Sequence, residues 1–205
     1  WSSDVCSSDL HRDIGMYFGA MKVRVEKAAE ERFPGHVCVI RPGLIVGERD
    51  TTGRYTYWPV RASEGGTMIA PGSGNDFIQY IDVRDLGDFT IGCIERKNMG
   101  AYNGISPASE RTSKDMIDSA VRVAKNKLDV QTEAEWIDSE FLESNGIQAW
   151  QHMPVWVPNS EEGYEGQGQL STAKSIKAGL KTRPIDDTAW NALNYYLVRG
   201  EEIKA

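Results

Sequence analysis

HVCVIRPGLIVG, residues 36–47, is a nearly continuous apolar run that is enriched in Val and Ile. A run this short and this apolar is typical of a parallel strand that is buried on both faces of its sheet. Pro42 and Gly43 interrupt the run toward its carboxyl end. The segment therefore predicts a central strand of an α/β sheet, with a break near its end.

Residues 19–33 precede this strand and have the spacing of an amphipathic helix. Lys22 and Glu26 are placed as an i,i+4 ion pair on its polar side, and Pro34–Gly35 ends it. The apolar stripe consists of Met21, Val25, Ala28, Ala29 and Phe33.

Helical and strand patterns alternate along the rest of the chain. Asp82 and Thr112 are expected to cap the helices that follow them. This alternation predicts an α/β protein. The expected strands are residues 67–70, 77–81, 101–105 and 133–137. The expected helices are 55–64, 83–96, 138–146, 171–178 and 186–197, with a further helix after Thr112 whose apolar face runs from Met116 to Ala124, and residues 159–169 form a loop.

The composition of the 205 residues is that of an ordinary globular protein, with 40% hydrophobic and 26% charged residues. No apolar run reaches the roughly 20 residues that a membrane-spanning helix needs. The net charge of −7 argues against a nucleic-acid partner. Cys6, Cys38 and Cys93 form no CxxC pair or metal-ligand spacing, which favours a reducing, cytoplasmic setting and no metal site.

The first ten residues, WSSDVCSSDL, differ from the rest of the chain. They are rich in Ser and Asp and have no periodicity. They resemble a sequencing adapter read through in frame, and the alternative is a natural disordered tail. We therefore expect residues 1–10 to be a non-native tail and residues 11–205 to be the domain.

Three stretches together resemble the extended short-chain dehydrogenases/reductases, the NAD-dependent epimerase/dehydratase family. They are Phe18–Lys22 running on to Glu26, Arg41–Gly47, and Asn75–Asp85. The first is similar to the family's Tyr-Gly-x-x-Lys-x-x-x-Glu helix. The resemblance implies that in this helix the Lys binds the nicotinamide ribose and lowers the pKa of the Tyr. The Tyr then acts as the general acid or base. Residues i and i+4 lie about 40° apart around a helix, so both side chains share one face.

Phe18 stands where the family has its catalytic Tyr. The nearby phenol is that of Tyr17, five residues before Lys22. Either a one-residue bulge at the helix start brings Tyr17 into the site, or the site lacks its acid/base. Loss of such a group usually lowers the rate by about 10²–10⁴-fold. On the first reading, Tyr17 and Lys22 are the catalytic residues.

The second stretch is similar to the turn that passes under the nicotinamide in the family. The resemblance implies that Lys22, Pro42, Gly43 and Ile45 bind NAD or NADP. Pro and Gly suit such a turn because one is stiff and the other lets backbone approach a ligand. In the third stretch, Asn75 replaces an Arg that grips the diphosphate of nucleotide sugars, which argues against that substrate class.

Aromatic residues fall in segments that line the substrate cleft of the resembled family. Tyr57, Trp58 and Arg61, with Asn75 and Gln79, are the candidate substrate-binding residues. The alternative is that the aromatic set, which includes Tyr55, Trp150, Met153 and Trp156, packs the core of the small C-terminal lobe.

The resemblance implies a truncated Rossmann-type parallel sheet with a small C-terminal α+β substrate lobe. No Gly-x-x-Gly-x-x-Gly loop follows a strand in the sequence, so the dinucleotide-binding N-terminal half is expected to be missing. The implied function is that of an NAD(P)-dependent oxidoreductase, epimerase or dehydratase that acts on a small hydroxy or keto compound, with a homodimer as the implied assembly. The alternative is a non-catalytic sensor or RNA-binding protein on the same scaffold.

Overall fold

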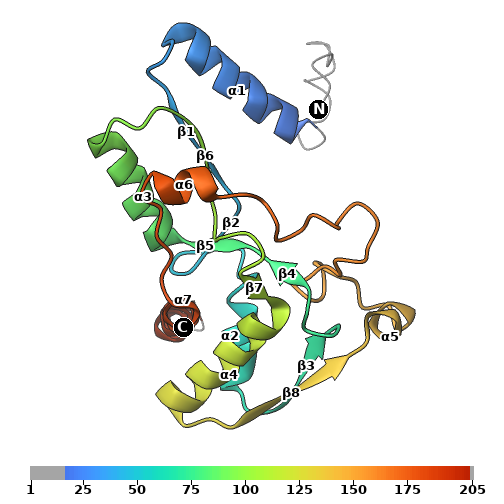
Figure 1. The fold of residues 1–205 in the computed structure, drawn as a ribbon. Coiled ribbons are helices and arrows are strands. Elements are labelled where there is room, and N and C mark those ends of the chain that lie inside the picture. Colours follow the sequence, from blue (N-terminus) through green and yellow to red (C-terminus); the bar gives the residue numbers. More distant parts are fainter. Residues whose placement is uncertain (1–16, 204–205) are drawn as a thin grey trace.

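The computed structural model describes residues 17–203, an α/β protein whose strands pair mostly in parallel (Figure 1). The expected tail, residues 1–10, lies outside the described residues. No helix among the described residues is both long and apolar enough to cross a bilayer. The elements in chain order are α1 (Phe18–Arg32), β1 (Cys38–Pro42), β2 (Leu44–Val46), α2 (Tyr57–Ser63), β3 (Gly66–Pro71), β4 (Phe77–Ile78), β5 (Tyr80–Asp82), α3 (Val83–Glu95), β6 (Gly100–Gly104), β7 (Arg111–Thr112), α4 (Ser113–Leu128), β8 (Thr132–Ile137), α5 (Ser139–Ser144), α6 (Ala173–Lys177) and α7 (Ile185–Ile203).

The predicted strand 36–47 is two strands that divide at Gly43. β1 pairs in parallel with β6, and β2 pairs in parallel with β5. A Cβ atom on residue 43 would lie 2.0 Å from Cδ1 of Ile105, so the close approach of these segments requires glycine there. The parallel pairing is confirmed. Burial on both faces is wrong, because residues 38–40 are only half-buried and residues 41–42 are exposed.

The predicted strand 77–81 is likewise divided, at Gln79. β4 pairs antiparallel with β7, a strand that the sequence did not predict, while β5 pairs with β2. β3 pairs in parallel with β8 over the full length of both strands. The chain thus passes from the β1–β6 part of the protein through β2 and β5 into a lobe built on β3 and β8 (Figure 1).

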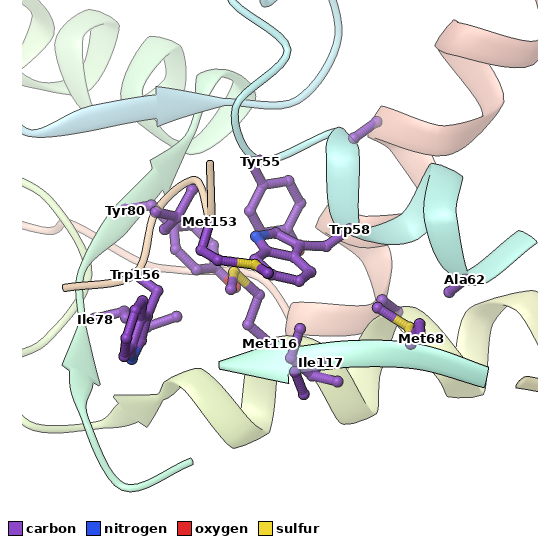
Figure 2. Close-up of a cluster of buried hydrophobic side chains, with 14 of the residues drawn as sticks. Tyr55, Trp58, Ala62, Met68, Ile78, Tyr80, Met116, Ile117, Met153 and Trp156 are labelled. Carbon is purple, nitrogen blue, oxygen red and sulfur yellow. The ribbon is translucent and has the colours of Figure 1, made fainter. Parts of the chain in front are cut away.

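The larger core lies in this lobe, between the β3–β8 pair and helices α2 and α4. Figure 2 shows Tyr55, Trp58 and Tyr80 packed together with methionine side chains in this core. Trp58 is fully buried, and its indole Nε1 donates a hydrogen bond to the Pro154 carbonyl oxygen at 2.8 Å. The alternative in which the aromatic residues form the lobe core is therefore confirmed for Tyr55, Trp58 and Trp156.

A second, smaller core lies beside β1 and β6, where α3 and the segment after α6 cover the strands. Phe89, Cys93 and Tyr102 are buried in it, and Cys38 packs against them. Burial, followed by the interaction with the Cys93 thiol, raises the pKa of Cys38 above its ordinary value. Cys38 and Cys93 thus behave as small apolar residues.

Helix α1 is present as predicted, but nothing in residues 17–203 covers its apolar stripe. None of its fifteen residues, all of which the structure describes, is buried. Val25 and Phe33 are 67% and 59% exposed. Figure 1 shows α1 at the margin of the molecule, connected to the amino end of β1. An uncovered apolar stripe next to a sheet strand is a surface suited to packing against further protein.

Both predicted helix caps are confirmed. The Asp82 carboxylate accepts a hydrogen bond from the Arg84 backbone N–H at 2.9 Å, and Arg84 Nη2 donates to Oδ2 of Asp82 at 2.7 Å. Thr112 and Asp115 form a reciprocal capping box at the start of α4. Burial disfavours the charged form of Asp82, but the hydrogen bonds from Arg84 outweigh it, so the pKa of Asp82 is below its ordinary value.

We expect Asp82 to make the protein acid-sensitive. Because its pKa is lowered on folding, its contribution is complete above the unfolded pKa of about 3.9 and is lost as the pH falls through the folded value. At pH 7, Asp82→Ala should cost about 2–3 kcal/mol of unfolding free energy, and Asp82→Asn, which keeps a cap acceptor, about 1–2 kcal/mol. Urea unfolding at pH 7 and pH 3 measures this. A loss for Asp82→Asn that is as large at pH 3 as at pH 7 would contradict it.

Candidate functional site

A groove of about 740 Å³ runs between α1 and the carboxyl end of β1. We call it the α1–β1 groove. Gly19, Lys22 and Val23 line it from the helix, and Arg41 and Pro42 line it from the strand, together with Phe18 and Glu26. The structure therefore brings together the two segments that the sequence analysis placed on either side of a nicotinamide.

Phe18 and Lys22 share one face of α1, as their i,i+4 spacing predicts. The Lys22 Nζ lies 5.1 Å from the centroid of the Phe18 ring, and the Phe18 side chain is 60% exposed. A cation at this distance from an aromatic ring is attracted by about 0.5–1 kcal/mol at an exposed position. The slot that faces the Lys22 amine thus holds a ring without a hydroxyl group.

Tyr17 is the residue that precedes α1, with φ −99° and ψ 8°. The Met21 N–H donates to the Tyr17 carbonyl oxygen at 2.9 Å, a regular i→i+4 helical bond. The described start of α1, residues 17–21, therefore has no one-residue bulge. Tyr17 is half-buried, and the groove-lining residues of α1 begin at Phe18.

Glu26 and Arg41 join the two walls of the groove. Arg41 Nη2 lies 2.5 Å from Oε2 of Glu26, and its Nε lies 3.0 Å from Oε1. The hydrogen bond from Arg41 lowers the pKa of Glu26, against a small opposing effect of burial. The sequence analysis paired Glu26 with Lys22 instead. The bidentate bond to a guanidinium is the stronger contact, and it leaves the Lys22 amine facing the groove and the Phe18 ring.

The groove has the size of a small-molecule site. Its volume lies within the roughly 300–1,000 Å³ of such sites. The Lys22 ammonium is the group in it that could donate to ligand hydroxyl groups, and Gly19 and Pro42 line the space beside it. Of the other expected cofactor residues, Gly43 follows Pro42 and packs against Ile105, and Ile45 lies in β2 with 38% of its surface exposed.

The expected substrate residues do not form one cluster. Trp58 is part of the lobe core, and Arg61 donates to the carbonyl oxygens of Gly65 and Thr67. The Tyr57 side chain is 41% exposed, and its ring packs edge-on against that of Trp58, with centroids 4.9 Å apart.

Asn75 is exposed in the turn before β4, and its backbone N–H bonds to Ser73 Oγ. Gln79 lines a second hollow, described below, at the junction of β4 and β5. Among the described residues, no group of three His, Cys, Asp or Glu side chains is placed to hold a metal ion.

The comparisons with solved structures agree with this architecture. The chain is similar to UDP-glucose 4-epimerase of Thermus thermophilus in complex with NAD, at 13% identity and a TM-score of 0.52, covering 87% of this chain and 52% of that one. It is similar to GDP-L-fucose synthetase of Naegleria fowleri bound to NADP, at 12% identity and a TM-score of 0.57, covering 91% and 54%. It is also similar to WbmF of Bordetella bronchiseptica in complex with NAD⁺, at 14% identity and 0.52, covering 85% and 49%.

Neither a protein-family model nor a curated protein matches the sequence. At these identities the likeness concerns the fold alone: the chain, an α/β protein with parallel strand pairs, resembles part of a Rossmann-fold epimerase. It spans about half the length of the proteins that it resembles.

A phenol introduced at position 18 tests the geometry of the groove. In Phe18→Tyr, the nearby Lys22 ammonium should stabilise the phenolate and give the new group a pKa of roughly 9–9.5 instead of about 10. Ultraviolet difference titration against the parent protein isolates the added group. Adding Lys22→Met should return its pKa to about 10. An introduced phenol that titrates identically with and without Lys22 contradicts the proposed arrangement.

Proposed function

We propose that this chain is the C-terminal part of an NAD(P)-dependent oxidoreductase, epimerase or dehydratase that acts on a small hydroxy or keto compound. The α1–β1 groove carries this proposal, because Lys22 of α1 and Pro42 at the end of β1 line the same space of about 740 Å³. The structural relatives with bound NAD or NADP support it.

In this proposal Lys22 binds the ribose hydroxyl groups, and the Glu26–Arg41 bond sets the distance between the helix and the strand end. The ion pair is largely exposed, so it contributes only about 0.2–1 kcal/mol of stability, and its role is to hold geometry. The nicotinamide, when bound, supplies the hydride acceptor or donor. Tyr17 is the phenol proposed to transfer the substrate proton, and with a regular first turn this requires a movement at the start of α1.

The substrate is proposed to be something other than a nucleotide sugar. Asn75 is a neutral amide in the slot where a diphosphate-binding Arg would stand, and it lies exposed in a turn. An amide cannot replace the bidentate charge of a guanidinium on phosphate. The cytoplasmic location and the homodimer stay predictions.

A non-catalytic binding protein is the second candidate. The Phe18 ring occupies the position from which a phenol would reach the Lys22 amine. A protein with Phe in this position could still bind a nicotinamide but would lack the proton-transfer group. These two properties suit a redox sensor. If the completed protein is active and keeps that activity after Tyr17→Phe, Tyr17 is not the proton-transfer group. The mechanism given above would then be wrong.

We also propose that an additional sheet half completes the fold. Within residues 17–203, β1 pairs with β6 alone, so its other edge is free, and α1 beside it is uncovered. An open parallel edge and an uncovered apolar helix are costly unless other protein covers them. DNA upstream of codon 11 in a longer read should encode a strand, a Gly-rich loop and a helix in the same frame.

The 205-residue chain should bind NADH weakly. The pyrophosphate of a dinucleotide is normally held by a Gly-rich loop at a helix N-terminus, which the sequence lacks. Titration with micromolar NADH should leave the tryptophan fluorescence unquenched, after correction for absorbance. The same chain joined to its proposed upstream half should bind NADH with a Kd in the micromolar range. Micromolar binding by the chain alone would contradict the truncation.

A further inference from the structure

A second hollow is lined in part by Leu44, two residues along the chain from Pro42 of the α1–β1 groove. Its volume is about 270 Å³. The apolar wall of this hollow, which we call the Trp150 pocket, consists of Leu44, Ile105, Trp150, Val155 and Leu170. Pro42 lines the groove and Leu44 lines the pocket. Two strand residues span about 7 Å, so one lining residue of each space lies close to the other along the backbone.

Two residues of the pocket wall have a strained backbone. Trp150 has φ +61° and Val155 has φ +70°, although neither is glycine. The left-handed region is unfavourable for a bulky residue and above all for a β-branched one. Such conformations concentrate at ligand sites, where the surrounding structure enforces them. The wall that Trp150 and Val155 form is therefore built at a cost in stability.

The lining residues within 166–170 belong to a loop that is fastened at two points. Gln79 donates to the carbonyl oxygens of Ser106 and Leu170 and accepts from the Leu170 N–H at 2.9 Å. Gly168 is packed so closely that a Cβ atom there would lie 2.5 Å from the Phe77 backbone. Gln79 thus shapes the pocket, and its amide is already bonded. The other amide side chain of the lining, that of Gln167, is the one proposed to bond a ligand oxygen.

None of the side chains that line the pocket is charged. The guanidinium of Arg54 lies over the Trp150 ring, 5.6 Å from its centroid, and its Nε donates to Thr52 Oγ1. The hollow is open to solvent, and its volume of about 270 Å³ lies just below the roughly 300–1,000 Å³ of small-molecule sites, which suits a compound of about two fused rings. A whole nucleotide sugar would extend beyond it.

We infer that the Trp150 pocket binds an uncharged, compact ring compound of about two fused rings that carries a hydroxyl or keto oxygen. This inference deepens the proposed function and rests on it for the reaction, because the pocket adjoins the groove proposed for the nicotinamide. Binding of the ring compound itself needs no cofactor, so the pocket can be tested independently of the groove.

The test uses 2-naphthol, which is uncharged at pH 7, and naphthalene-2-sulfonate, which has the same rings and a fixed charge. Equilibrium dialysis against the 205-residue chain should give a Kd of roughly 0.1–1 mM for 2-naphthol. The sulfonate should bind about tenfold more weakly or worse, because the pocket offers no partner for its charge.

Two variants locate the binding. Leu170→Trp fills the mouth of the pocket from a half-exposed position and should abolish 2-naphthol binding. Ile94→Trp is the matched control on the exposed surface of α3 and should leave the Kd unchanged. Absence of binding at millimolar 2-naphthol, equal binding by both variants, or equal affinity for the sulfonate would each overturn the inference. Failure of NADH to bind the completed protein would overturn the proposed function and leave the pocket standing.

Discussion

The close contact between Gly43 and Ile105 is the constraint on which the rest of the structure depends. A side chain at residue 43 would collide with the buried side chain of Ile105, the residue that follows β6. At Gly43 the chain changes partners, from β6 along β1 to β5 along β2. That change carries the polypeptide from the sheet into the lobe. Pro42, just before Gly43, lines the groove, and Leu44, just after it, lines the Trp150 pocket.

The two spaces differ in chemistry in a way that suits two different ligands. The groove has one ammonium, from Lys22, and an ion pair that joins its walls. The pocket has an apolar wall and amide side chains. A ribose with several hydroxyl groups is suited to the first, and an apolar ring is suited to the second. The buried Asp82 carboxylate and its partly exposed partners Arg84 and Arg183 line neither space and instead anchor α3 and the segment before α7.

Much of the fold was predictable because its signals are local. The caps at Asp82 and Thr112, the break near Gly43 and the helix that carries Lys22 follow from short-range residue patterns. The division of residues 77–81 at Gln79 was not predictable, because β4 and β5 have different partners, and pairing is decided by distant segments.

The candidate site was predicted less well, for the same reason. Adjacent residues Tyr57 and Trp58 have equivalent sequence signals, yet α2 buries one and exposes the other. Arg61 looks like an anion ligand in sequence, but its guanidinium is used by the backbone carbonyls of Gly65 and Thr67. The Trp150 pocket depends on left-handed backbone at Trp150 and Val155, and nothing in those residue types indicates such a conformation.

The central claim is that α1 and the end of β1 hold a nicotinamide between them. The most direct measurement is an amide ¹H–¹⁵N NMR titration of the chain with reduced nicotinamide mononucleotide, which carries the ring and ribose and needs no pyrophosphate loop. We predict saturable shifts at Gly19, Lys22 and Gly43 at millimolar ligand, with AMP leaving these amides unmoved. No shifts at roughly 10 mM, or the same shifts with AMP, would contradict the account.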